Sequence, residues 1–113
     1  MIRAELYRDN DGHWIGYSAK GHSGYAEEGS DIVCAAVSIL SATCVNSLES
    51  VCGIVPEIED NGDGVLRFSL PQGLDACKLH DAQVLLGALG QGLSDLAEQF
   101  PHNVRFSIHD GRK

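Results

Sequence analysis

The segment IVCAAVSILSATCVNSLESVC, residues 32–52, constrains the fold of this 113-residue chain more than any other. Its apolar side chains recur at helical spacing. They are Val33, Val37, Leu40, Cys44, Leu48 and Val51. Asp31 precedes the segment as a good N-cap, while Gly53, with Pro56 shortly beyond it, is a stop signal. The sequence therefore predicts a long helix with one apolar side.

A second helical pattern runs from about residue 75 to residue 100, with Asp75 as its acidic cap. The stretch GALGQG, residues 87–92, places three glycines inside it, and each costs about 1 kcal/mol relative to alanine. We interpret these glycines as points of close packing against the sheet or the first helix. A contact with another subunit is the alternative.

Five segments have the character of strands. They are IRAELYR (2–8), HWIGYSAK (13–20), GIVPEIED (53–60), GVLRFSL (64–70) and HNVRFSIHD (102–110). The turn sequences NDG and NGDG predict two hairpins, and Leu66, Phe68 and Leu70 form the inward side of the fourth strand. The order β-β-α-β-β-α-β predicts an α+β fold in a single domain, 1–113. It is a two-layer sandwich, in which two helices cover one face of a mixed, largely antiparallel sheet.

The formal net charge is −8, from 16 acidic and 8 basic residues. A field of that sign repels phosphate backbones, so direct binding of nucleic acid is not expected. It favours a basic partner, such as a lysine-rich protein tail, although it also serves solubility.

No apolar run is expected to approach the roughly 20 residues of a membrane helix, so no membrane partner is predicted. The first residues alternate like a strand rather than a signal peptide. Four cysteines without a secretory signal are expected to stay reduced, in a cytoplasmic protein.

A cysteine stands close to the start of the first helix. If Asp31 is the N-cap, Cys34 is the third helical residue, where unpaired N–H groups and the helix dipole favour a thiolate. The Asp31 carboxylate opposes this effect, although its capping hydrogen bonds absorb part of its charge. Ser38 lies one turn later on the same face, where it can hydrogen-bond the sulfur or orient a substrate.

A loop over residues 21–30 joins the second strand to this helix. Three of its residues are glycines, Gly21, Gly24 and Gly29, which suggest mobility and close backbone approach. A loop of this length can bring His22 over the helix start, where a Cys–His pair forms a thiolate–imidazolium nucleophile. The helix-start amides, including that of Cys34, would then be donors to an oxyanion.

Two other interpretations compete with this site. Cys34 could be an ordinary buried core cysteine. Cys77 and His80 also lie on one face of a helix start, so they satisfy the same thiolate argument without the flexible loop. A Cys-x-x-His pair can be half of a zinc site, but no second half appears at the right spacing, and no metal is expected. Cys52, at a helix C-terminus, should be inert.

The stretch GHSGYAEEGSDIVCAAVS, residues 21–38, resembles the bacterial ribosomal-processing cysteine protease family Prp, and the similar order of elements covers nearly all of the chain. The family motif is a Gly-His-x-Gly loop followed, after a Gly and an Asp, by Ile-Val-Cys-Ala-Ala-Val-Ser. The matching positions are Gly21, His22, Gly24, Gly29, Asp31, Ile32, Val33, Cys34, Ala35, Ala36, Val37 and Ser38. At position 23 the family usually has a small residue such as Ala, and Ser23 is expected to leave the chemistry unchanged.

The resemblance implies a homodimeric protease without a cofactor. It removes the N-terminal extension of bacterial large-subunit ribosomal protein twenty-seven by a cut just after a pair of aromatic residues. It assigns the nucleophile to Cys34 and the general base or acid to His22. Supporting or substrate-binding roles fall to Gly21, Gly24, Gly29, Asp31 and Ser38. A non-catalytic ribosome-associated binding or assembly module is the alternative function, because the acidic charge fits a basic ribosomal tail equally well.

Overall fold

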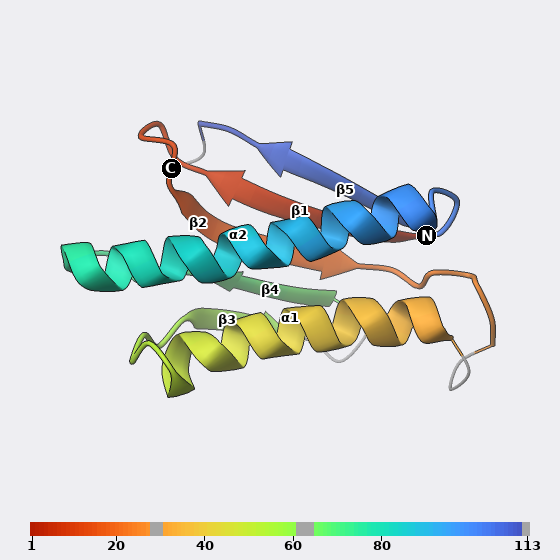
Figure 1. The fold of residues 1–113 in the computed structure, drawn as a ribbon, viewed down its shortest axis with the longest axis horizontal. Helices are drawn as coiled ribbons and strands as arrows, with labels where there is room; N and C mark the ends of the chain where they lie inside the picture. Colours follow the sequence, from red (N-terminus) through yellow and green to blue (C-terminus); the bar gives the residue numbers. More distant parts are fainter. Residues whose placement is uncertain (28–30, 61–64, 112–113) are drawn as a thin grey trace.

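A mixed sheet forms one layer of the molecule and two helices form the other (Figure 1). The computed structural model describes residues 1–27, 31–60 and 65–111. Over these residues the elements are β1 (Ile2–Arg8), β2 (Trp14–Lys20), α1 (Ile32–Ser50), β3 (Glu57–Asp60), β4 (Val65–Ser69), α2 (Ala76–Gln99) and β5 (Val104–His109). Both helices lie on the same face of the sheet, so the predicted α+β sandwich is confirmed (Figure 1).

The strands follow the order β3-β4-β2-β1-β5. The pairs β1–β2, β2–β4 and β3–β4 are antiparallel, and β5 is parallel to β1. Helix α2 is the crossover from β4 to β5, which run in the same direction on opposite sides of the β2–β1 pair. The sheet is therefore mixed and largely antiparallel, as predicted.

The turn of the first hairpin is held by Asp9. Its side-chain Oδ1 accepts hydrogen bonds from the backbone N–H of Asp11 at 2.9 Å and of His13 at 3.0 Å. Gly12 has φ 81°, a left-handed conformation that glycine adopts without a steric cost. The predicted NDG turn is thereby confirmed, whereas the predicted NGDG turn, residues 61–64, lies outside the described residues.

Helix α1 begins as predicted, with Asp31 as its N-cap, but it ends at Ser50. Val51 is 76% exposed, so its assignment to the apolar side of the helix is wrong. The next strand starts only at Glu57 rather than at residue 53, because Pro56 has no N–H for the ladder and Ile54 packs into the core.

By length and composition alone, α1 could also cross a membrane, so the expectation that no apolar run approaches that length is wrong. A core helix meets the same criterion. Six of its residues are buried in the domain, namely Val33, Val37, Ser41, Cys44, Val45 and Leu48.

Two of the three glycines of α2 pack as predicted, one against the sheet and one against α1. A Cβ at Gly90 would lie 2.8 Å from Leu6 Cδ1 in β1, and a Cβ at Gly92 would lie 3.0 Å from both methyl carbons of Leu40 in α1. Gly87, by contrast, has no heavy atom within 4 Å of such a Cβ. Two of the three glycines therefore bring α2 close to the sheet and to α1.

One buried hydrogen bond joins the sheet to α1. The hydroxyl of Tyr17, which is fully buried in β2, lies 2.7 Å from Ser41 Oγ. Ser41 in turn donates to the Val37 carbonyl at 2.8 Å. Burial raises the pKa of Tyr17 to about 12. This contact ties α1 to the strand that leads into the 21–30 loop.

Candidate active site

A cleft of about 360 Å³ contains both residues of the predicted pair, His22 and Cys34. Its other lining residues come from four strands, from α1 and, for Gly21, from the loop between β2 and α1. They are Ile2, Ala19, Lys20, Gly21, Val37, Ser38, Ser41, Ala42, Asp60, Val65 and Leu66. The histidine approaches from the end of β2 and the cysteine from the start of α1. The cleft is thus formed where the two elements meet.

Cys34 is the third residue of α1 and is partly exposed. Its Sγ accepts a hydrogen bond from the backbone N–H of Ser23, with N and S 3.4 Å apart. The sulfur is therefore both accessible from the cleft and held by a polar contact.

Asp31 uses both carboxylate oxygens. Oδ1 accepts from the N–H of Val33 at 3.0 Å and of Cys34 at 2.9 Å. Oδ2 accepts from the Ser23 hydroxyl and from the Ala26 N–H, which is 3.4 Å away. The Ser23 hydrogen bond is the main reason that the pKa of Asp31 falls to about 2, and the backbone donors add to it.

The same contacts correct one prediction. The Cys34 N–H, expected to be a free donor for an oxyanion, is occupied by Asp31 in this conformation. The four donors also fill the acceptor positions of the carboxylate, which leaves Asp31 as a cap and a loop anchor rather than a partner that orients His22.

The loop glycines have different surroundings. Gly21 has φ 97°, and a Cβ there would collide with the carbonyl oxygen of Met1, so the chain passes too close for any other residue. Gly24 has φ 70° but open space around it. His22 and Ser38 are both exposed and line the cleft. The predicted supporting residue Gly29 lies outside the described residues.

Ser23 is the residue whose importance the sequence did not reveal. A serine in place of the family's alanine was expected to leave the chemistry unchanged. In the structure Ser23 is only 2% exposed and contacts both Asp31 and Cys34. Its carbonyl accepts from the side-chain amide of Asn103 at 2.9 Å, across 80 positions of sequence. A serine beside a histidine is a weak signal, and nothing in the local sequence points to Asn103.

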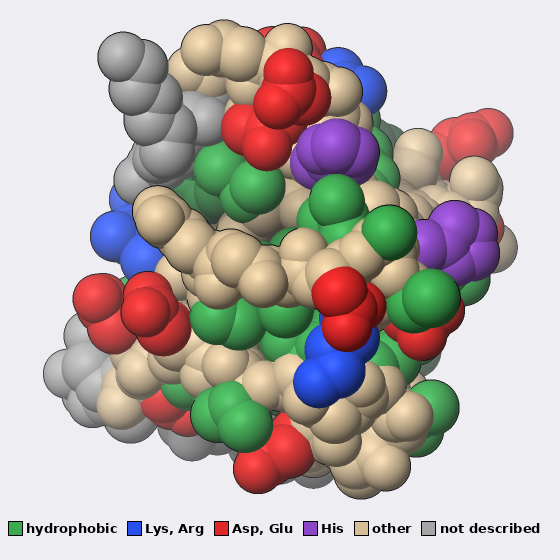
Figure 2. All heavy atoms as spheres, turned by 90° about the vertical axis from the view of Figure 1, so that its left-hand side faces the viewer, with side chains coloured by type: hydrophobic (Ala, Val, Ile, Leu, Met, Phe, Trp, Pro, Cys, Tyr) green, Lys and Arg blue, Asp and Glu red, His purple; other side chains and the backbone are tan. Residues whose placement is uncertain are grey.

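The competing pair lies far from this cleft. The start of α2 and the start of α1 lie at opposite ends of the molecule (Figure 1). Cys77 and His80 are exposed, and His80 Nδ1 lies 3.5 Å from Asp81. Figure 2 looks onto the end where α2 starts, and acidic side chains are scattered over it. Neither residue lines the cleft with His22.

The other two cysteines have no place in the cleft lining. Cys44 is buried, and burial raises the pKa of its thiol to about 11, so it remains protonated. Cys52 lies beyond the last residue of α1. All four cysteines are free in the described chain.

One group of described residues has ligand atoms close enough for a metal ion, namely Asp9, Asp11 and His13, whose ligand atoms lie within 4.8 Å of one another. It sits in the first hairpin turn, where Asp9 already holds the backbone.

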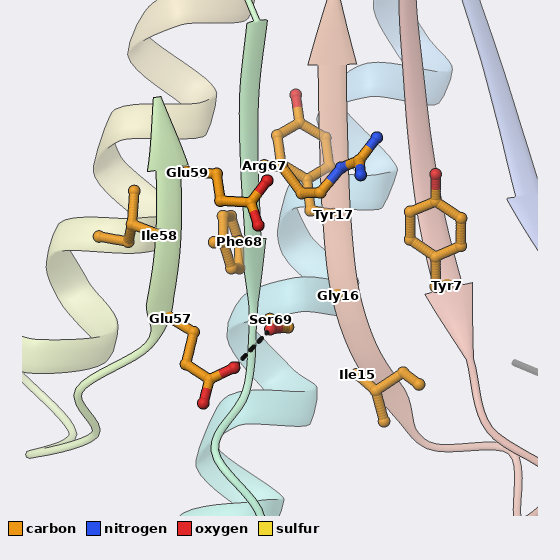
Figure 3. A pocket seen from close by; sticks show the side chains of 10 residues that line it. All are labelled: Tyr7, Ile15, Gly16, Tyr17, Glu57, Ile58, Glu59, Arg67, Phe68 and Ser69. Carbon is orange, nitrogen blue, oxygen red and sulfur yellow. Dashed lines mark hydrogen bonds between the residues drawn. The ribbon is translucent and has the colours of Figure 1, made fainter. Parts of the chain in front are cut away.

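A second hollow, of about 450 Å³, lies on the sheet face opposite the helices (Figure 3). It opens over Gly16, and Glu57, Glu59 and Arg67 project around it. Ser69 donates to Glu57 over 3.4 Å, but the lining contains neither a cysteine nor a histidine. The cysteine and histidine of the predicted pair therefore line the cleft and not this hollow.

Comparison with known sequences decides the family. The sequence model of the cysteine protease Prp family matches residues 1–105. The chain belongs to this family of cysteine proteases. It is 29% identical to the ribosomal processing cysteine protease Prp of Bacillus subtilis (strain 168) over 110 residues, which cover 96% of this chain and 98% of that protein.

Solved structures agree with the Prp assignment. The crystal structure of SMU.848 from Streptococcus mutans has a TM-score of 0.83 and 34% identity, and the match covers 97% of this chain and 95% of that one. Prp from S. aureus, solved with a covalently linked product peptide, has a TM-score of 0.85 at 24% identity, over 96% and 99% of the two chains. The latter likeness shows that the fold is shared.

Proposed function

We propose that this protein is a cysteine endopeptidase in which Cys34 is the nucleophile and His22 the general base and acid. The observation that carries the proposal is that both residues line one cleft, with a backbone N–H donating to the cysteine sulfur. Membership of a cysteine protease family supports the same chemistry.

The reaction follows from the pair. The Cys34 thiolate attacks the scissile carbonyl carbon, and the C=O electrons move to oxygen. The C–N bond then breaks as imidazolium His22 gives its proton to the leaving amine. Neutral His22 next takes a proton from water, whose oxygen attacks the thioester. The acid product leaves, and the thiolate and imidazolium are restored.

As the substrate we propose the N-terminal extension of bacterial large-subunit ribosomal protein twenty-seven, removed during ribosome maturation. The Bacillus subtilis relative is a ribosomal processing protease, and the S. aureus relative has been solved with a substrate peptide. The apolar side chains of Ile2, Val37 and Leu66 in the cleft suit the aromatic pair before the cut. The net charge of −8 and exposed Glu27 suit a basic tail. We further propose that the enzyme is cytoplasmic and homodimeric.

The test is cleavage of a peptide that carries two aromatic residues before the cut site, under reducing conditions. Wild-type protein and Cys77→Ser should cleave it, and Cys34→Ala and His22→Ala should not. Cys77→Ser is the matched control, because it removes a thiol at another helix start. If Cys34→Ala binds a ribosomal tail and the wild type leaves every such peptide intact, the protein is the binding module instead.

A further inference from the structure

The strand-to-helix loop is anchored at Ser23 in three directions. The side-chain hydroxyl donates to Asp31 Oδ2 and accepts from the Tyr25 N–H at 3.0 Å. The carbonyl accepts from Asn103, just before β5, at 2.9 Å. The backbone N–H donates to Cys34 Sγ. With only 2% of its surface exposed, Ser23 is the most enclosed residue of the described loop.

These contacts share a geometric consequence. The hydroxyl fixes Ser23 to the helix N-cap, and the carbonyl fixes it to the turn between α2 and β5, so two separate contacts hold the residue whose N–H donates to the sulfur. His22 is the preceding residue, and the same anchors therefore limit how far its backbone can move from the cleft.

We propose that Ser23 is a positioning residue, which holds its own N–H against the Cys34 sulfur and keeps the adjoining His22 at the cleft. The proposal rests on the proposed function in that Cys34 is the reacting group. The N–H stabilises negative charge on sulfur before the attack. Because Asp31 and Asn103 already hold Ser23, this donor is in place without a movement of the loop. Ser23 itself makes no bond to the substrate.

The first test compares the reactivity of two cysteines in one molecule. Wild type, Ser23→Ala and Asn103→Ala are treated with iodoacetamide at pH 7, and adducts at Cys34 and Cys77 are counted by mass spectrometry. The Cys34:Cys77 rate ratio should fall about fivefold in each variant, about 1 kcal/mol. Asn103→Ala removes the hydrogen bond to the Ser23 carbonyl, so it tests the proposal even if Ser23→Ala does not fold.

Ser18→Ala is the matched control. Ser18 is also a buried serine, 8% exposed, but its hydroxyl contacts Tyr7 at 3.0 Å on the opposite face of the sheet. This variant should lose some stability and keep the Cys34:Cys77 ratio and the cleavage rate. If Ser23→Ala and Asn103→Ala also keep the wild-type ratio, Ser23 is merely structural and the proposal is overturned.

Two further measurements separate the outcomes. In Ser23→Ala, kcat should fall while KM changes little, because Ser23 is not among the residues that line the cleft. The carboxyl carbon of Asp31, followed by NMR, should titrate above the wild-type pKa of about 2, since its main hydrogen bond is gone. Failure of the wild type to cleave would overturn the proposed function, whereas the alkylation ratio tests Ser23 without any cleavage.

Discussion

The hydrogen bond between Tyr17 and Ser41 allows an unequal pair of mutations to be predicted. Ser41 Oγ donates its proton to the Val37 carbonyl, so the Tyr17 hydroxyl is the donor in the contact between the two side chains. Both side chains are buried, at 0% and 3% exposure. Removing the donor and removing the acceptor therefore leave different groups behind in the core.

The Tyr17→Phe variant loses one hydrogen bond but leaves no buried polar atom without a partner, because Ser41 keeps its hydrogen bond to the Val37 carbonyl. The expected loss of unfolding free energy is about 1 kcal/mol. The Ser41→Ala variant leaves the Tyr17 hydroxyl buried without its acceptor, and the desolvation penalty raises the expected loss to about 2–3 kcal/mol. The double variant should lose less unfolding free energy than the two single variants together, since it has no buried Tyr17 hydroxyl without an acceptor.

Urea unfolding of the four proteins measures these values, and thermal unfolding should shift by about 4 °C or more per kcal/mol. An order in which Tyr17→Phe costs at least as much as Ser41→Ala would refute the reasoning. Strict additivity in the double variant would refute it as well.

Three further predictions rest on other contacts. The raised pKa of Tyr17, about 12, means that its stabilising effect is complete below about pH 10 and is lost as pH rises toward 12, so Tyr17→Phe should flatten the alkaline part of a stability–pH curve. The lowered pKa of Asp31 has the opposite effect on the pH dependence. Its contribution to stability is present above about pH 3.8 and disappears as pH falls toward 2, and Asp31→Ala should remove that acid dependence. Gly87→Ala should stabilise the protein by about 1 kcal/mol through helix propensity, whereas Gly90→Ala should lose that gain against Leu6, as urea unfolding of both variants would show.

Local patterns predicted the elements well because each depends on neighbours in sequence. Asp31 before a helical period was sufficient to place Cys34 at the third helical residue, and glycines in α2 were sufficient to predict close packing. The strand expected from residue 53 starts at Glu57, since packing of Ile54 against the core decides that stretch. Tertiary contacts, not periodicity, fixed this boundary.

In the candidate site, too, the sequence predicted some features and missed others. The pairing of His22 with Cys34 came from loop length and family resemblance, and both residues line one cleft. Neither source indicated that Asp31 would occupy the Cys34 N–H, or that Asn103 would reach the loop from 80 positions away. The Asp31 contact is the N-cap hydrogen bond to the third helical residue, whereas the Asn103 contact depends on how β5 and the 21–30 loop come together, which no local pattern specifies.

The most direct test of the central claim is the site of covalent capture by a substrate-like electrophile. A peptide chloromethyl ketone that ends in two aromatic residues would be incubated with the wild-type protein and with His22→Ala, and the adduct located by mass spectrometry. A single adduct on Cys34 in the wild type, formed much more slowly in His22→Ala, is the predicted result. An adduct on Cys77, or equal capture by the two proteins, would contradict the account.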